Sequence, residues 1–274
     1  MLRSMYSGVS GMRGFQTKLD VIGNNIANVN TVGFKAGRVM FKDILSQSMS
    51  GVTASAEGDQ GGVNAKQIGL GVTVAAIDTL HTPGSAMTTG KSTDLRIDGD
   101  GFFAVSPGGD GEQVYLTRAG NFDLDANRQL VNADGMFVLD SGGGIIQLDE
   151  EVTAFSISQT GEIISIGADG LAAPTGVFIA VTVVANPGGL EKVGGNLYRM
   201  TPNANPDGEL EELGQASDPE TGSGAIVSGQ LEMSNVDLTN EFTEMIVAQR
   251  GFQSNSRIIT TSDEILQEVV NLKR

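Results

Sequence analysis

Residues 236–274, VDLTNEFTEMIVAQRGFQSNSRIITTSDEILQEVVNLKR, carry an apolar residue at every seventh position. The members of this row are Leu238, Met245, Phe252, Ile259 and Leu266. A seven-residue apolar repeat sustained over four heptads is typical of a helix that packs in a coiled coil. The stretch therefore predicts one long amphipathic helix with a coiled-coil-like seam.

The companion positions of this row are mixed in character. Phe242 and Val270 are apolar, whereas Gln249, Ser256 and Asp263 are polar. A second apolar row on another side of the same helix comprises Ile258, Ile265, Val269 and Leu272. A helix of about 39 residues would be about 58 Å long and would present apolar rows to more than one neighbour. We therefore expect it to pack against other chains.

The first thirty residues repeat the pattern on a smaller scale. Met5, Met12, Leu19 and Ile26 recur every seven residues, and Leu2, Val9 and Ile22 lie beside them on the same face. Three glycines, at positions 8, 11 and 14, each cost about 1 kcal/mol relative to Ala in a helix. We expect contacts with other chains to offset this cost. The expected assembly interface comprises Leu2, Met5, Val9, Met12, Leu19, Ile22, Ile26, Leu238, Phe242, Met245, Phe252, Ile259, Leu266 and Val270.

The middle of the chain is rich in glycine and in short runs of β-branched residues. The candidate strands are residues 71–80, 94–97, 102–105, 113–117, 120–124, 136–139, 152–158, 163–166 and 177–184. The predicted class is therefore α+β. A discontinuous coiled-coil domain of terminal helices (1–30 and 236–274) would carry an inserted all-β domain (76–235). Residues 31–75 would be a linker, because Ser46 to Gly62 is a low-complexity connector.

Composition excludes several classes of function. The chain has 33 acidic and 17 basic residues and a net charge of −16, so a nucleic-acid partner is not expected. It has no cysteine, which excludes disulfides and thiolate chemistry. The first fifteen residues contain no apolar signal region, and the longest apolar run, 177–185, is about half of the roughly 20 residues that span a membrane. We therefore expect a soluble protein with no cleavable signal peptide and no membrane insertion.

Searches for catalytic or ligand-binding motifs give nothing specific. The single histidine, His81, lies in a turn-like setting and is expected to be a satisfied surface or turn residue. Asp123, Asp125, Asn127 and Asp134 resemble an EF-hand loop, but its glycine position is Arg128, so a hairpin turn is the better interpretation. No catalytic, cofactor-binding or metal-ligating residue is expected. A glycan-binding or glycan-cleaving β domain stays as an alternative and would need a pair of carboxylates about 5–9 Å apart in a cleft.

Two stretches resemble the paired signatures of one family. Residues 19–35 (LDVIGNNIANVNTVGFK) and 229–272 (GQLEMSNVDLTNEFTEMIVAQRGFQSNSRIITTSDEILQEVVNL) are similar to the rod and hook proteins of the bacterial flagellar axis. Segments of the middle, such as IDGDGFFAV and NPGGLEKVGGNLY, also resemble that family. The matching signature residues are Asn24, Asn25, Ala27, Asn28, Gly33, Phe34, Ser234, Asn235, Gln249 and Asn255, and Lys35 and Glu232 match as well.

The resemblance implies a subunit that is exported unfolded by the flagellar export apparatus and polymerises with many copies of itself into a hollow tube. It favours the short hook protein of Gram-positive bacteria, a bendable universal joint that transmits torque, and the distal rod protein is the alternative. The other implied partners are rod and hook–filament junction proteins at the ends of the tube. The implied location is extracellular, in the hook or basal body.

Overall fold

The computed structural model describes residues 2–52, 61–108, 113–149, 152–167, 171–205 and 213–272. The chain divides into two compact units, each built from separate segments. Unit 1 comprises residues 1–27, 37–79 and 237–274, and unit 2 comprises residues 28–36 and 80–236. Helices and strands occur together, which confirms the α+β class.

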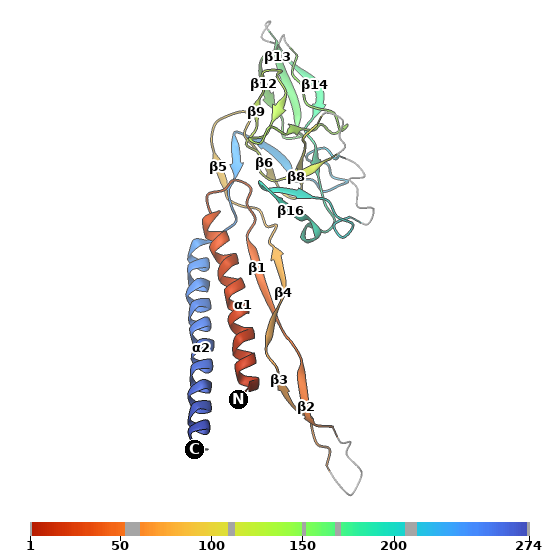
Figure 1. Cartoon of the computed structure of the whole chain (residues 1–274). Helices are drawn as coiled ribbons and strands as arrows, with labels where there is room; N and C mark the ends of the chain where they lie inside the picture. Colours follow the sequence, from red (N-terminus) through yellow and green to blue (C-terminus); the bar gives the residue numbers. More distant parts are fainter. Residues whose placement is uncertain are drawn as a thin grey trace. The chain divides into compact units, whose positions relative to one another are not determined.

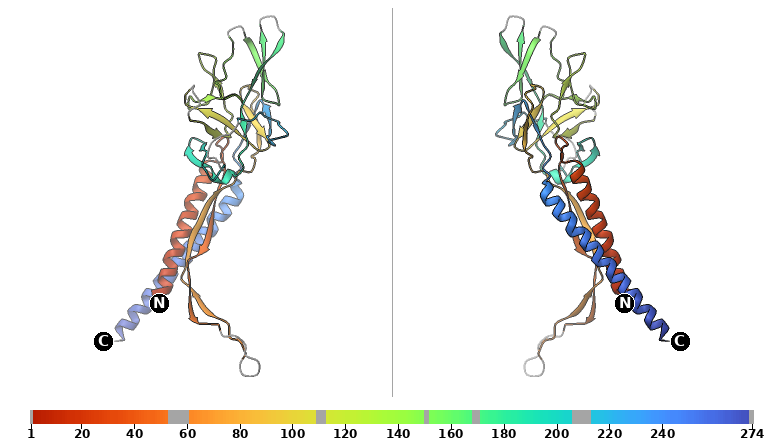
Figure 2. Two further views of the ribbon diagram at one scale, coloured as in Figure 1. Left: turned by 90° about the vertical axis from the view of Figure 1, so that its right-hand side faces the viewer. Right: turned by 90° about the vertical axis from the view of Figure 1, so that its left-hand side faces the viewer.

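Unit 1 contains two long helices. Helix α1 is Leu2–Ala27 and helix α2 is Leu238–Asn271. The N-terminus of α2 is capped by Asp237, whose Oδ1 accepts hydrogen bonds from the N–H groups of Thr239 (2.9 Å) and Asn240 (3.4 Å). The two helices lie side by side within the unit (Figures 1 and 2). The 34 residues of α2 make it about 51 Å long.

A β-ribbon accompanies α1 along its length. Strands β1 (Gly37–Asp43) and β4 (Val72–Thr79) pair antiparallel from Gly37–Thr79 to Asp43–Val72, with a bulge between Met40 and Phe41. The ribbon continues as β2 (Ser46–Ser50) and β3 (Lys66–Gly69), whose residues are all exposed. Strands β1, β2 and β3 occupy the stretch that was expected to be a linker, whereas β4 coincides with the strand expected at residues 71–80. They form because β1 and β4 supply each other's backbone hydrogen bonds, although the low-complexity sequence beside them gives little apolar signal.

The three glycines of α1 permit close packing within this chain. A Cβ atom added at Gly8 would lie 3.4 Å from Ile259, and one at Gly11 would lie 2.7 Å from the Nδ2 of Asn255. At Gly14 it would lie 2.9 Å from the ring of Phe41. Contacts with other chains were expected at these glycines, and within this single copy they contact α2 and the ribbon.

Unit 2 is built from short antiparallel strands. Its strands are β5 (Ala86–Thr88), β6 (Leu95–Asp98), β7 (Phe102–Ser106), β8 (Tyr115–Thr117), β9 (Asp123–Leu124), β10 (Leu130–Val131), β11 (Phe137–Val138), β12 (Val152–Ile157), β13 (Glu162–Gly167), β14 (Ala172–Phe178), β15 (Val181–Thr182), β16 (Glu191–Gly194), β17 (Leu197–Arg199), β18 (Ala225–Ser228) and β19 (Gln230–Glu232). The largest sheet has the order β16-β17-β8-β7-β11-β10-β9, and β15 also pairs with β7. Strands β12, β13 and β14 form a separate sheet, and β6 pairs with β18 and β5 with β19. A 3-10 turn, Pro187–Gly189, precedes β16.

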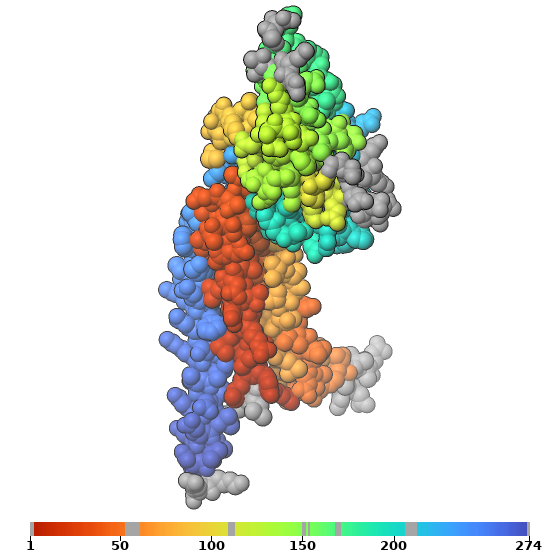
Figure 3. All heavy atoms as spheres, turned by 45° about the horizontal axis from the view of Figure 1, so that its top comes forward, coloured from red at the N-terminus to blue at the C-terminus, as the bar shows by residue number. Residues whose placement is uncertain are grey.

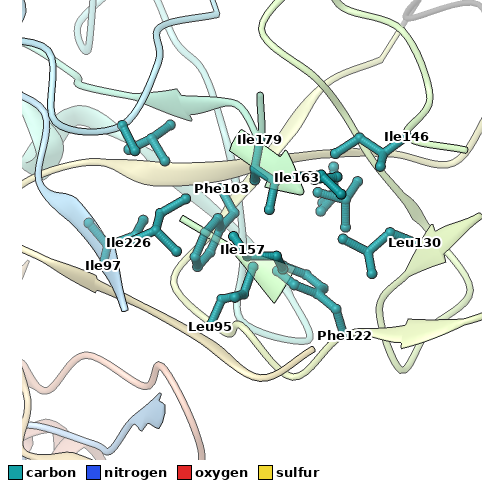
Figure 4. Packing of buried hydrophobic residues seen from close by; sticks show 14 of the residues in the cluster. Leu95, Ile97, Phe103, Phe122, Leu130, Ile146, Ile157, Ile163, Ile179 and Ile226 are labelled. Atoms are coloured by element: carbon teal, nitrogen blue, oxygen red, sulfur yellow. The ribbon is translucent and has the colours of Figure 1, made fainter. Parts of the chain in front are cut away.

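The core of unit 2 is aliphatic with two central aromatic rings. Phe103 and Phe122 meet edge to face with ring centroids 5.2 Å apart. Isoleucines from several strands, including Ile97, Ile163 and Ile226, pack around these rings (Figure 4). These side chains are at most 2 % exposed, so unit 2 has a complete hydrophobic core of its own.

Candidate assembly interface

The two helices of unit 1 meet in an antiparallel register. As residue numbers rise along α1, the numbers of their partners on α2 fall. The neighbouring pairs are Gly8 with Ile259, Gly11 with Asn255, Phe15 with Gly251, and Lys18 with Glu244, the last pair being an ion pair. In this register the first residues of α1 lie opposite Ile265 and Leu266. The last two turns of α2 therefore extend past the start of α1 (Figures 1 and 2).

The predicted interface residues of α1 are largely covered within unit 1. Ile22 is 4 % exposed. The side chains of Met5, Val9, Met12, Leu19 and Ile26 are half-buried. The side chain of Leu2 lies outside the described part of the chain. This helix face is therefore mostly occupied already in a single copy of the chain.

The predicted interface residues of α2 are more open. Leu238, Phe242, Phe252 and Val270 are exposed, while Met245, Ile259 and Leu266 are half-buried. The second row is also exposed: Ile258 at 41 %, Ile265 at 49 %, Val269 at 51 % and Leu272 at 85 %. Exposed apolar side chains that repeat along one helix are typical of interaction surfaces. Of the polar positions in the seam, Gln249 and Asp263 are exposed and Ser256 is half-buried.

A groove of about 450 Å³ lies on the other side of α1, between that helix and the ribbon. Its walls are Tyr6, Val9, Ser10, Arg13, Gly14 and Thr17 on α1, and Ile44, Leu70, Val72, Thr73 and Val74 from the ribbon. Ser10 links the two walls of the groove, because its hydroxyl oxygen accepts a hydrogen bond from the N–H of Val72 (3.3 Å). Figure 3 shows α1 with α2 on one flank and the ribbon on the other.

Asn25 joins three segments of unit 1. It is 2 % exposed, and its Nδ2 donates to the carbonyl of Gly37 (2.8 Å) and to Oε1 of Glu241 (3.0 Å). Its Oδ1 accepts from the N–H of Gly37 (3.0 Å). One side chain thus ties the end of α1 to the start of β1 and to the first turn of α2. Burial raises the pKa of Glu241 above its usual value, while the hydrogen bond from Asn25 opposes that shift.

Asn235 likewise joins separate segments of the chain in unit 2 through hydrogen bonds. Its Oδ1 accepts from the N–H of Ala36 (2.8 Å), and its Nδ2 donates to the carbonyl of Leu80 (2.8 Å) and to Oγ1 of Thr82 (2.9 Å). The signature residue Gly33 lies nearby in sequence and has φ +69°, and a Cβ there would lie 2.6 Å from the backbone nitrogen of Ala119. These signature residues therefore hold separate segments of the chain together.

The other signature residues vary in their surroundings. Asn24, Ala27 and Gln249 are exposed. Asn28 accepts a hydrogen bond from Oγ1 of Thr31 (3.1 Å), and the hydroxyl oxygen of Ser234 accepts one from the N–H of Val236 (3.3 Å). Phe34 is buried beneath the ammonium of Lys192, which lies 5.1 Å from its ring centroid. Asn255 packs against Gly11 in unit 1.

A buried ion cluster lies in unit 2 around Glu232. Lys35 is fully buried, and its Nζ donates to Oε1 of Glu232 (2.6 Å) and to the carbonyl of Thr82 (2.8 Å). Arg118, also buried, donates to Oε2 of Glu232 (3.4 Å), and Oε1 further accepts from the N–H of Gly84 (2.9 Å). Burial lowers the pKa of Lys35, and the Glu232 carboxylate opposes that change. The Glu232 carboxylate thus neutralises two buried cations, as buried charges require, while Nε of Arg118 is buried without a hydrogen-bond partner among the described residues.

His81 differs from its expected setting. It is half-buried, with its ring 5.6 Å from Phe102 and 5.5 Å from Tyr198, centroid to centroid. Its Nδ1 is buried and has no hydrogen-bond partner among the described residues. Burial, followed by the charges of Lys35, Lys192 and Arg118, lowers the pKa of His81 to about 4. The residue is therefore a neutral packing element at pH 7. The sequence could not reveal this, because the cations that surround it come from distant segments.

Two other expectations concern possible ligands of unit 2. Residues 123–131 form the hairpin β9–β10, in which the N–H of Arg128 donates to the carbonyl of Asp125 (2.8 Å), so the turn interpretation is confirmed. A cavity of about 400 Å³ is lined mainly by amides and hydroxyls, among them Asn121 and Asn196, and Asp134 is the one carboxylate among its described lining residues. A single carboxylate there gives no support to a pair of the glycosidase kind.

Two kinds of feature are absent from the part of the chain that the structure describes. No group of three or more potential metal-ligating side chains was found there. None of its helices combines the length and the apolar character needed to cross a membrane.

Comparison with known proteins supplies the family. Three family profiles match: "Flagella basal body rod protein" at residues 5–35, "Flagellar hook protein FlgE/F/G D1 domain" at residues 96–165, and "Flagellar basal body rod FlgEFG protein C-terminal" at residues 227–272. These profiles cover both signature regions and the first half of unit 2. The resemblance drawn from the sequence is therefore confirmed.

Individual relatives separate the rod from the hook. The flagellar basal-body rod protein FlgG of Bacillus subtilis is 55% identical over 274 residues, which covers all of both chains. FlgG of Borreliella burgdorferi is 36% identical over 276 residues, again covering both chains completely. The flagellar hook protein FlgE of the same species is 30% identical over an alignment of 452 residues that also covers both chains. The preference for a hook protein is therefore less well supported than its rod alternative.

Proposed function

Since this chain belongs to the family of flagellar rod and hook proteins, we propose that it is a structural subunit of the rod, in its distal part. Many copies would polymerise helically into a hollow drive shaft that transmits motor torque. The observation that carries the choice of rod is the 55% identity with a rod protein over the full length of both chains. The hook relatives support membership of the axial family and not this finer assignment.

The exposed apolar rows of α2 support a polymer. A single copy leaves Phe242, Ile265, Val269 and Leu272 about half exposed or more, and burying the rest of each would contribute a part of the about 1.5–3 kcal/mol that complete burial gives. Two terminal helices from every copy would form a discontinuous coiled-coil domain and the inner wall of the tube. In this proposal residues 1–30 and 236–274 make the core, 31–75 connect it, and 76–235 form the outer domain.

The partners follow from the same proposal. The main partner is a second copy of the chain, and other rod proteins and hook proteins would meet the ends of the shaft. The subunit would be passed outward by the flagellar export apparatus and would function outside the cytoplasm, in the basal body. No role in this proposal falls to a cofactor, a metal ion or a catalytic residue, and rod and hook proteins are a structural family.

Electron microscopy of the purified, assembled chain tests the proposal. A rod subunit is expected to give straight hollow tubes, because a drive shaft must not bend. Curved tubes would instead support the hook assignment, and an absence of any helical assembly would remove both. Expression of the chain in a bacterium that lacks its own rod protein, followed by a motility assay, provides the matching functional test.

A further inference from the structure

The groove between α1 and the ribbon is a candidate binding site that a single copy does not fill. It opens on the face of α1 that carries Tyr6, Val9 and Arg13, whereas Gly8 and Gly11 on the opposite face contact α2. The α2 helix of the same chain therefore cannot reach it, because α1 lies between them. None of the described residues of the same copy fills the groove, which leaves it open to another molecule.

The overhanging end of α2 has the shape of such an occupant. Ile265, Val269 and Leu272 are exposed and stand at positions i, i+4 and i+7, the spacing with which a helix anchors itself in an apolar groove. They span about 10 Å along the helix axis, and the α1 wall of the groove, from Tyr6 to Thr17, spans about 16 Å. Ile265 lies level with the start of α1 and is 49 % exposed, and the helix beyond Leu266 extends past the described residues of α1, so this end is open to a second copy.

Charge favours the same pairing. The groove contains one charged side chain, the exposed Arg13. Glu268 lies next to the anchor residues on α2, one turn before Leu272, and the described residues 258–272 contain three acids and no base. An arginine in the groove wall and a carboxylate beside the anchors are complementary and would help to fix the register.

We propose that the last two turns of α2, with Ile265, Val269 and Leu272 as anchors, dock into the α1–ribbon groove of a second copy, with Glu268 of one copy facing Arg13 of the other. This inference rests on the proposed polymer and names one of its contacts. Each copy would supply one helix end and one groove, so the contact is head-to-tail and repeats along an assembly without closing on itself.

The absence of cysteine from the chain allows a clean cross-linking test. Full-length chains carrying Val269→Cys are mixed with chains carrying Thr73→Cys or, in a second mixture, Thr17→Cys, both in the groove wall. The mixtures are assembled, oxidised and analysed by non-reducing electrophoresis. The control replaces Val269→Cys with Thr260→Cys, an exposed position on another side of α2. At least one groove position should give roughly tenfold more heterodimer with Val269→Cys than with Thr260→Cys, since a disulfide requires Cα atoms within about 7 Å.

The outcomes separate this contact from the polymer as a whole. If tubes form and neither groove position cross-links to Val269→Cys above the control, the contact is wrong and the rod proposal stands. If the wild-type chain never polymerises, the proposed function fails, and the contact with it.

Charge reversal at the proposed Glu268–Arg13 pair gives a second readout. Glu268→Arg should raise the critical concentration roughly two- to fivefold, as loss of an exposed ion pair does. Adding Arg13→Glu to the same chain should restore it, and a double variant no better than the single one counts against the pairing.

Discussion

Glu232 forms ion pairs with two buried cations of unit 2, Lys35 and Arg118. Replacing it by glutamine would leave Lys35 and Arg118 buried with no carboxylate beside them. Breaking a buried ion pair in this way costs about 3–5 kcal/mol. We expect Glu232→Gln to lower the free energy of unfolding of unit 2 by an amount in this range, measured by urea titration of the fluorescence of Tyr115 and Tyr198.

The exposed pair Glu191–Arg199 offers a matched control. Both side chains are more than half exposed, and their oxygen and nitrogen lie 2.6 Å apart. Glu191→Gln removes the same charge from solvent-screened surroundings, so it should change stability little. Equal losses in the two variants would show that burial of the cluster does not determine its energy.

His81 predicts a pH dependence of stability. Its pKa is about 4 in the folded chain and about 6.5 when unfolded, so between these values the unfolded chain binds more protons. The contribution of neutral His81 is therefore complete above about pH 6.5 and is lost as the pH falls towards 4. We expect the stability of wild type minus that of His81→Phe, measured by thermal denaturation, to decrease from pH 7 to pH 4.5. A difference that is constant with pH would contradict the lowered pKa.

At the level of the helices, two glycines predict opposite effects of the same substitution. A Cβ added at Gly251 on α2 would lie 2.6 Å from the ring of Phe15, whereas one at Gly23 on α1 meets nothing within 4 Å. Gly251→Ala should separate the helices and lower the melting temperature of unit 1. Gly23→Ala should raise it, because alanine favours a helix over glycine by up to about 1 kcal/mol. Far-ultraviolet circular dichroism during heating measures both, and stabilisation by Gly251→Ala would show that the close approach is not required.

Some elements could be predicted from the sequence because their signal is local. The apolar rows located both helices, and the run Phe102–Val105 located β7. Strand β4 was predicted as residues 71–80, but β1 was missed, because it becomes a strand by pairing with β4 across about 35 residues of chain, a long-range effect that composition does not record. Strands β16 and β17 were also not predicted, because the stretch that joins them is rich in glycine and gives the signal of a turn.

The candidate site was predictable in part. The apolar periodicity identified the second row of α2, which is exposed as an interface row would be. Asn25 and Asn235 were identified only through family resemblance, because an isolated buried amide leaves no periodic pattern. The groove was missed, since its walls combine α1 with ribbon residues that follow about 30 to 70 positions later. A signal did exist: Tyr6, Val9, Arg13 and Thr17 recur at helical spacing on one face.

For the molecule as a whole, the two units predict that assembly and folding of unit 2 can be separated. Deleting residues 250–274 removes Phe252, Ile259, Leu266 and Val270 from the assembly face and touches no residue of unit 2. The shortened chain should keep the melting transition of unit 2, followed through its tyrosines, yet form no tubes in sedimentation and electron microscopy. Normal tubes from this chain would mean that α2 is not the main contact.

The pairing of α1 with α2 also bears on how the chain is made. The two helices contact each other across more than 200 residues of intervening sequence. A ribosome that adds about 5–20 residues per second needs about 10–40 s between completing α1 and beginning α2. During that interval α1, with three glycines in its first half, has no partner helix in its own chain, and an isolated helix of this kind is marginal in water. Translation therefore imposes a delay before unit 1 can close, and for that time the nascent N-terminal segment stays an open chain that other proteins can bind.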